Sequence, residues 1–168
     1  PVLAMEIAEQ VIDKAEEGGL AAASLVNGNY VGALAPYVER IADRGMLGIC
    51  AANSTPRVAP HGGRQGVHGT NPLAYAVPSI GIEPLVFDAA TGHSAARVGA
   101  AREQGVPLED GVLIDGEGLP SNDPEALDGG ALLPVGGALG YGLGLLVDLL
   151  CGGLSLIHIS EPTRLDGI

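Results

Sequence analysis

Residues 53–72 read NSTPRVAPHGGRQGVHGTNP, and this stretch limits how the chain on either side of it can fold. Three prolines and four glycines among its twenty residues exclude the interior of a helix or strand, so it is a loop. Its Gly62-Gly63 pair lets backbone N–H groups approach a ligand closely, and its hydroxyls come from Ser54, Thr55 and Thr70. Such a loop can hold an anionic cofactor group without lysines. The alternative is an ordered surface loop, although loops of this length are often functional.

Apolar periodicity on both sides of the loop predicts helices that alternate with strands. The expected helices span 4–17, 32–44 and 141–150, with a further one that is capped by Thr91 or Ser94 and runs to about 104. The expected strands span 20–26, 46–52, 73–77, 85–87 and 112–114. This alternation predicts an α/β fold, expected as a three-layer mixed sheet flanked by helices. The sequence GYGLGL at 140–145 lacks the G-x-G-x-x-G spacing and follows no strand, so no Rossmann fold is implied.

Composition narrows the class of protein. The 168 residues carry a formal net charge of −12, which disfavours binding to the phosphate backbone of nucleic acids. The start of the chain lacks the basic and apolar regions of a signal peptide, and two cysteines in apolar runs fit buried thiols, so we expect a cytoplasmic protein. An apolar run at 131–159 contains Asp148 and many glycines, which favours a buried helix over a membrane span.

The last residues have an unusual sequence. Residues 154–164 read LSLIHISEPTR, which resembles the translation of a transposase-type sequencing adapter. We therefore expect 154–168 to be a non-native tail; a natural strand followed by a turn at Pro162 is the alternative. The chain also opens inside an expected helix without an initiator Met, so we expect its natural start to be missing.

Several motifs, taken together and in order, resemble the malate/L-lactate dehydrogenase family, which includes ureidoglycolate, sulfolactate and malate dehydrogenases and a cyclic-imine reductase. The matching segments are V-A-P-x-G-G at 58–63, G-T-N-P at 69–72, D-A-A-T at 88–91, D-G-E-G-L-P with D-P at 115–124, and G-G with G-Y-G-L at 136–143. The resemblance covers roughly residues 1–153. Family chains are about twice as long, so the resemblance implies that residues 1–153 are the central NAD(P)-binding portion of a larger, incomplete dehydrogenase.

The resemblance also implies an activity. Family members transfer hydride between NAD or NADP and the C2 carbon of a small 2-hydroxy or 2-keto acid such as malate or lactate, on a fold that is not Rossmann. They are typically homodimers. The resemblance implies cofactor contacts at Ser54, Pro60, Gly62, Gly63, Thr70, Asp88, Ala89, Ala90 and Leu139.

Asp88 also has an argument of its own. It follows the apolar run Pro84 to Phe87, so a carboxylate emerges at the end of a strand, where ligands gather in open α/β sheets. We expect Asp88 to orient or polarise the reacting centre. The alternative is a structural one, a helix cap near Thr91.

Two positions depart from the family pattern. Tyr30 occupies the place of the proton-transferring His of an N-S-x-H-x-G segment, and Leu139 occupies the place of a Lys before G-Y-G-L. A phenol has a pKa of about 10 against about 6.5 for imidazole, so Tyr30 is a weak proton-transfer group at neutral pH. An alternative function is therefore a catalytically impaired member that only binds nucleotide or a partner.

Other polar residues are less informative. Arg57, Arg64 and Arg97 are candidates for contact with a carboxylate or phosphate, with Arg64 the best placed because it lies in the glycine loop. His61 and His68 are interpreted as polar loop surface rather than a metal pair, and no metal site is expected.

Overall fold

The computed structural model describes residues 2–26, 28 and 30–153. These residues form two compact units, one built from 2–51 and 73–89 and the other from 52–72 and 90–152. The tail predicted at 154–168 lies outside the described residues. No helix in the described part is long and apolar enough to cross a membrane.

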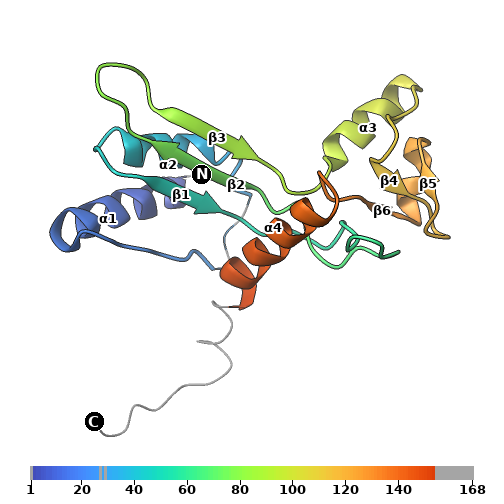
Figure 1. Ribbon diagram of the computed structural model, residues 1–168, viewed down its shortest axis with the longest axis horizontal. Coiled ribbons are helices and arrows are strands. Elements are labelled where there is room, and N and C mark those ends of the chain that lie inside the picture. Colours follow the sequence, from blue (N-terminus) through green and yellow to red (C-terminus); the bar gives the residue numbers. More distant parts are fainter. Residues whose placement is uncertain (1, 27, 29, 154–168) are drawn as a thin grey trace, which may run out of the picture. The chain divides into compact units, whose positions relative to one another are not determined.

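The first unit contains a three-stranded sheet covered by helices. Its helices are α1 (Val2–Gly18) and α2 (Ala35–Ala42), and its strands β1 (Gly48–Ala51), β2 (Leu73–Val77) and β3 (Leu85–Ala89) pair antiparallel in the order β1-β2-β3. Helix α2 lies across one face of the sheet and α1 packs against α2 (Figure 1).

Strand β2 shows why one face of this sheet is covered. Ala74 and Ala76 are fully buried beneath α2, while the intervening Tyr75 points to the opposite face. On that face Tyr75 lies between Ile49 and Phe87 in the strand register, and the rings of Tyr75 and Phe87 stack with centroids 5.1 Å apart. The small alanines let the helix approach the sheet closely.

The predicted helix at 4–17 and the strands predicted at 46–52, 73–77 and 85–87 are confirmed by α1, β1, β2 and β3. The strand predicted at 20–26 is wrong: its described residues have no regular secondary structure, and Leu20 is 87% exposed. An apolar run forms a strand only where a neighbouring strand pairs with it, and this run has none among the described residues.

The helix predicted at 32–44 is shorter, because it begins at Ala35 with Pro36 in its first turn and ends before a turn that reaches Gly45. Proline fits the first turn of a helix because the N–H that it lacks has no partner inside the helix.

The second unit is built around a smaller sheet. Strands β4 (Leu113–Ile114), β5 (Pro120–Ser121) and β6 (Ala131–Leu132) pair antiparallel in the order β5-β4-β6. Helix α3 (Ala95–Gln104) and the 3₁₀ helix η1 (Pro124–Asp128) pack against this sheet, as Figure 1 shows. Helix α4 (Ala138–Asp148) and one π-helical turn, η2 (Leu149–Gly153), follow. The main core comprises Val58, Val98, Ala101, Leu108, Val112, Leu113 and Leu132.

Of the two caps predicted for α3, Ser94 is the one that acts: its hydroxyl accepts a hydrogen bond from the N–H of Arg97 at 3.3 Å. The strand predicted at 112–114 is confirmed by β4, and the helix predicted at 141–150 is confirmed as α4, which begins earlier.

The α/β class is therefore confirmed, but the described strands form two small antiparallel sheets rather than the expected three-layer mixed sheet. Strands β2 and β3 are joined by a short turn, and parallel pairing would need a crossover connection. One parallel bridge does occur, between Val58 and Leu132.

Candidate functional site

The loop at 53–72 is folded onto itself and onto β6. The N–H of Val58 donates to the carbonyl of His68 at 2.9 Å, and the N–H of Val67 donates back to the carbonyl of Val58 at 2.9 Å. The N–H of Ala59 donates to Leu132 at 2.9 Å. Because Val58 and Ala59 are fully buried, these two residues of the V-A-P-x-G-G motif anchor the loop in the core.

Asn71 holds this loop against α4. Its side chain is fully buried, its Nδ2 donates to the carbonyl of Gly144 at 2.8 Å and to Asp148 Oδ1 at 3.2 Å, and its Oδ1 accepts from the N–H of Ser54 at 3.2 Å. Its φ of 39° is in the left-handed region, which Asn tolerates better than other non-glycine residues. One amide thus joins the two ends of the loop to the helix.

Thr91 stabilises the same junction. Its N–H donates to the carbonyl of Thr70 at 2.9 Å, and its hydroxyl lies 3.1 Å from that oxygen and 3.0 Å from the carbonyl of Asn71, so it can donate to either. The N–H of Thr70 in turn donates to Ser54 Oγ at 3.2 Å. Two residues predicted to bind the cofactor, Ser54 and Thr70, are therefore direct neighbours.

Two glycines permit this packing. A Cβ on Gly69 would lie 2.1 Å from Ser54 Oγ, and a Cβ on Gly144 would lie 2.7 Å from the Cε1 of His68. Real Cβ atoms do not approach other atoms so closely, so a side chain at Gly69 would push the two ends of the loop apart and one at Gly144 would push the loop away from α4.

His68 is part of this packing, so its interpretation as polar loop surface is wrong. It is 2% exposed, its ring stacks on Tyr141 with centroids 5.5 Å apart, and its Nδ1 lies 2.7 Å from the carbonyl of Gly69. Because a carbonyl oxygen can only accept, Nδ1 of His68 is the donor in that contact. His61 lies exposed on the loop. Within the described residues, no group of three His, Cys, Asp or Glu side chains could hold a metal ion.

Two side chains of the second unit, His93 and Cys151, have shifted pKa values. Burial, followed by the charge of Arg97, lowers the pKa of His93, so the imidazole is neutral at pH 7. Burial raises the pKa of the Cys151 thiol, which therefore stays protonated and is a poor nucleophile.

The two arginines of the loop, Arg57 and Arg64, differ from the other described arginines, which all form ion pairs. Arg97 forms an ion pair with Glu109 at 2.8 Å. Arg57 and Arg64 are exposed and form no ion pair with any residue that the structure describes, although the chain carries a net charge of −12. The methylene carbons of Arg64 lie against Gly118, which supports the side chain and leaves its guanidinium exposed. The loop therefore offers two cations that no carboxylate among the described residues neutralises.

The remaining candidates of the second unit lie at the loop tip and on α4. Gly62 adopts a φ of 78° in a turn closed by the N–H of Gly63, which donates to the carbonyl of Pro60 at 2.8 Å. Leu139 lies in the first turn of α4 and is 71% exposed. Ala90 is exposed and immediately precedes Thr91.

The candidates of the first unit are Tyr30, Asp88 and Ala89. Tyr30 is 87% exposed. Asp88 and Ala89 end β3, and Asp88 Oδ2 accepts from the N–H groups of Leu34 at 2.7 Å and Ala35 at 2.8 Å. The alternative interpretation, in which Asp88 caps a helix near Thr91, is therefore wrong about the helix. The Asp88 carboxylate caps α2.

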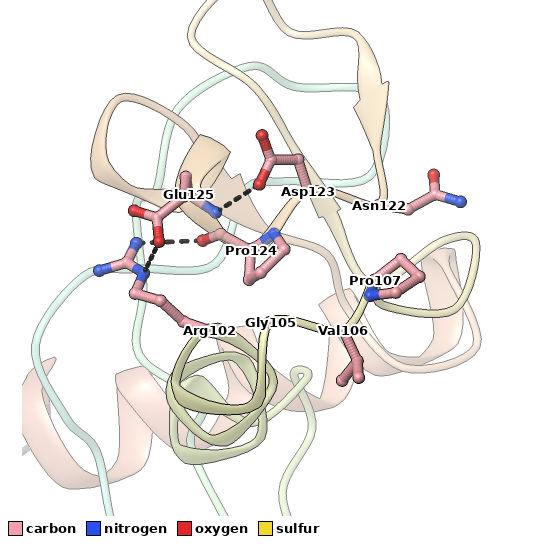
Figure 2. Close-up of a pocket in the computed structure, with 8 residues that line it drawn as sticks. All are labelled: Arg102, Gly105, Val106, Pro107, Asn122, Asp123, Pro124 and Glu125. Atoms are coloured by element: carbon pink, nitrogen blue, oxygen red, sulfur yellow. Dashed lines mark hydrogen bonds and ion pairs between the residues drawn. The ribbon is translucent and has the colours of Figure 1, made fainter.

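A shallow pocket of about 390 Å³ lies elsewhere in the second unit and is shown in Figure 2. None of the predicted site residues lines it. Arg102 donates to the carbonyl of Pro124 at 3.0 Å and to Asp128 at 2.9 Å, and its Nε forms an ion pair with Glu125 at 3.2 Å. These contacts neutralise the charge of Arg102, although its buried Nε has no hydrogen-bond partner among the described residues. The pocket is the gap between the C-terminal end of α3 and η1.

Sequence reasoning missed three residues of the loop junction: Asn71, Thr91 and Asp148. Asn71 and Thr91 are members of the motifs G-T-N-P and D-A-A-T, but a motif does not say which of its members are buried. Asp148 was weighed only as an argument against a membrane span. Each of the three is a polar residue within an apolar or glycine-rich segment of the sequence. Because buried polar groups are almost always hydrogen-bonded, this pattern could have indicated that they bond to one another.

We expect Asn71→Ala to lower the free energy of unfolding by about 2–4 kcal/mol, because it leaves buried backbone groups unbonded and forces alanine into the left-handed region. Urea denaturation of the full-length protein measures this. Asn122→Ala is the matched control: its exposed side chain makes one hydrogen bond to Asp110, so the loss is about 0.5 kcal/mol or less. Asn71→Gly, which removes the strain but not the lost bonds, should remain destabilised. Equal stability of the Asn71→Ala and Asn122→Ala proteins would contradict the role given to Asn71.

Comparison with known proteins shows which family this chain resembles. The family model for malate/L-lactate dehydrogenase matches residues 1–166. A Delta(1)-pyrroline-2-carboxylate/Delta(1)-piperideine-2-carboxylate reductase of Pseudomonas syringae pv. tomato is 44% identical over 147 residues, which are 86% of this chain and 43% of the reductase. A (2R)-3-sulfolactate dehydrogenase (NADP(+)) of Chromohalobacter salexigens is 37% identical over 151 residues, 89% of this chain and 45% of that enzyme. A ureidoglycolate dehydrogenase (NAD(+)) of Escherichia coli K12 is 39% identical over 145 residues, 86% of this chain and 41% of that enzyme.

Solved structures show the same fold. The crystal structure of delta1-piperideine-2-carboxylate reductase from Pseudomonas syringae superposes with a TM-score of 0.83 at 41% identity, covering 88% of this chain and 45% of the reductase. That of a dehydrogenase from Sinorhizobium meliloti superposes with a TM-score of 0.87 at 38% identity, covering 92% and 46%. The chain spans less than half the length of these relatives. Its motifs, its fold and its similarity to these enzymes place it in the malate/L-lactate dehydrogenase family.

Proposed function

We propose that the full-length protein is an oxidoreductase that transfers hydride between NAD or NADP and the C2 carbon of a small 2-hydroxy or 2-keto acid. The names of the relatives support this class: sulfolactate and ureidoglycolate carry a hydroxyl beside a carboxylate, and the cyclic reductase substrates carry an imine there. Malate and lactate are the simplest candidates. We further propose that the complete enzyme has the layered non-Rossmann fold expected from the sequence, is cytoplasmic and forms a homodimer.

The observation that carries this proposal is a pair of exposed arginines, Arg57 and Arg64, that form no ion pair within the described part of the chain, on a loop whose Ser54, Thr70 and Gly63 make hydrogen bonds. In a chain of net charge −12, an exposed cation without a carboxylate partner is available for an anionic ligand, and a dinucleotide supplies phosphates. The donor set of Ser54, Thr70 and Arg64 fits such a group, since each can donate to an oxygen.

In this proposal the cofactor is held by Ser54, Pro60, Gly62, Gly63 and Thr70 of the loop and by Ala90 and Leu139. The bound nicotinamide gives or accepts the hydride. Arg64 and Arg57 neutralise phosphate or substrate carboxylate. Tyr30 donates or accepts the proton at the substrate C2 oxygen.

A fluorescence titration with NADH and NADPH tests cofactor binding by the full-length protein. Arg64→Gln should weaken the preferred cofactor roughly 10-fold or more, since a charge-assisted hydrogen bond contributes about 1.5–3 kcal/mol. Arg97→Gln is the matched control, because Arg97 already pairs with Glu109, and its affinity should match the wild type. Absence of any fluorescence change at high protein concentration would overturn the proposal, and equal effects of the two variants would remove Arg64 from the site.

The second candidate is a member that binds nucleotide or a partner without catalysis. It is favoured by the chemistry of two exposed side chains: a phenol at Tyr30, 87% exposed, and an aliphatic group at Leu139, 71% exposed, where the family pattern has His and Lys.

The double substitution Tyr30→His with Leu139→Lys separates the two candidates. We expect measurable turnover of 2-keto acids and of cyclic imine acids by the wild-type full-length protein, and a higher kcat in the double variant because imidazole titrates near neutral pH. Turnover that is absent in the wild type and appears only in the double variant would instead establish the non-catalytic member.

A further inference from the structure

We infer that Asp88 is a positioning residue, whose carboxylate caps α2 and thereby fixes the segment that carries Tyr30. The inference deepens the proposed function and rests on it for the role of Tyr30. In this inference the Asp88 carboxylate does not contact the cofactor. It acts on Tyr30 through the backbone of residues 31–35.

The first observation is the cap itself. Helix α2 has Leu34 at its N-cap, and Leu34 has no polar side chain with which to bond the first N–H groups. Asp88 Oδ2, on strand β3, supplies the missing acceptor: it accepts from Leu34 N at 2.7 Å and from Ala35 N at 2.8 Å. The next residue, Pro36, has no N–H to satisfy. A carboxylate at this end also interacts favourably with the helix dipole.

The second observation is the strand that holds the carboxylate. Asp88 pairs with Ala74 in the register of β3 against β2, two residues along from the pair Val86–Ala76, and the fully buried Ala74 and Ala76 mark the face that α2 covers. Helix α2 lies over this face of the sheet (Figure 1). Because alternate residues of a strand face the same side, the side chain of Asp88 lies on the face that α2 covers. The position of Asp88 in the strand therefore selects the helix terminus as its partner.

The third observation is a second tether on the same segment. The hydroxyl of Tyr37, in the first turn of α2, donates to the carbonyl of Val31 at 2.7 Å. Residues 31–34 are thus held at one end by Tyr37 and at the other by Asp88, while Leu34 is buried. Tyr30 directly precedes this held segment. Since its own side chain is exposed, the backbone on its C-terminal side is what fixes its direction.

The three observations give Asp88 a role that differs from cofactor contact in its consequences. If Asp88 acts through α2, removing the carboxylate loosens residues 31–35 and misplaces Tyr30, which lowers kcat and leaves cofactor affinity unchanged. If the carboxylate binds the cofactor, its removal weakens affinity and leaves the amides of α2 protected.

The experiment compares Asp88→Ala and Asp88→Asn in the full-length protein by hydrogen–deuterium exchange, with kcat and the Kd for NADPH measured on the same samples. In Asp88→Ala we expect the amides of Leu34 and Ala35 to exchange roughly 10-fold faster or more, kcat to fall roughly 10- to 100-fold, and Kd to stay within about twofold. Asparagine can still accept from both N–H groups, so Asp88→Asn should rescue most of the protection, exchanging no more than about fivefold faster than the wild type.

Asp110→Ala is the control: Asp110 accepts a bond from Asn122 in the second unit, so its loss should leave exchange at Leu34 and Ala35 unchanged. Unchanged exchange of these amides in Asp88→Ala would overturn the inference, as would a Kd that weakens by more than kcat falls. A wild-type protein that binds neither NADH nor NADPH would defeat the proposed function instead, while the exchange comparison still decides whether Asp88 holds residues 31–35.

Discussion

The buried amide of Asn71 is the constraint on which the candidate site depends. A loop rich in proline and glycine has little regular secondary structure, so its shape depends on individual backbone and side-chain hydrogen bonds to its neighbours. Asn71 provides them by bonding Ser54 at the start of the loop and Gly144 and Asp148 on α4. Its hydrogen bonds are made away from water, where an unmade one is costly. Asn71 therefore ties the two ends of the loop to α4.

Glycine and charge act together with this amide. Gly69 lets the two ends of the loop approach, which brings Ser54 beside Thr70, and Gly144 lets α4 approach the loop, where His68 stacks on Tyr141. Arg57 and Arg64 remain outside this packing without carboxylate partners in the described part of the chain, although acidic residues predominate. A fixed backbone with unneutralised cations is the physical basis of an anion site.

The fold was predictable where one local rule decided the outcome. Apolar spacing identified α1, β1, β2 and β3, and Ser94 was identified as a possible cap because serine favours that place. Prediction failed where a distant residue decided. The run at 20–26 has the composition of a strand but no neighbour, and α2 begins at Ala35 because Asp88 caps it from β3. At the site, the motifs identified Ser54 and Thr70, whereas burial alone distinguishes Asn71 and His68 as supports.

The central claim is that the fixed loop at 53–72 seats the nucleotide, and the most direct measurement is a map of amide protection caused by the cofactor. Hydrogen–deuterium exchange of the full-length protein, with and without saturating NADPH, reports which backbone groups the ligand shields. The claim predicts added protection at Ser54, Gly62, Gly63 and Thr70. Tight NADPH binding with no change of exchange anywhere in residues 53–72 would contradict it.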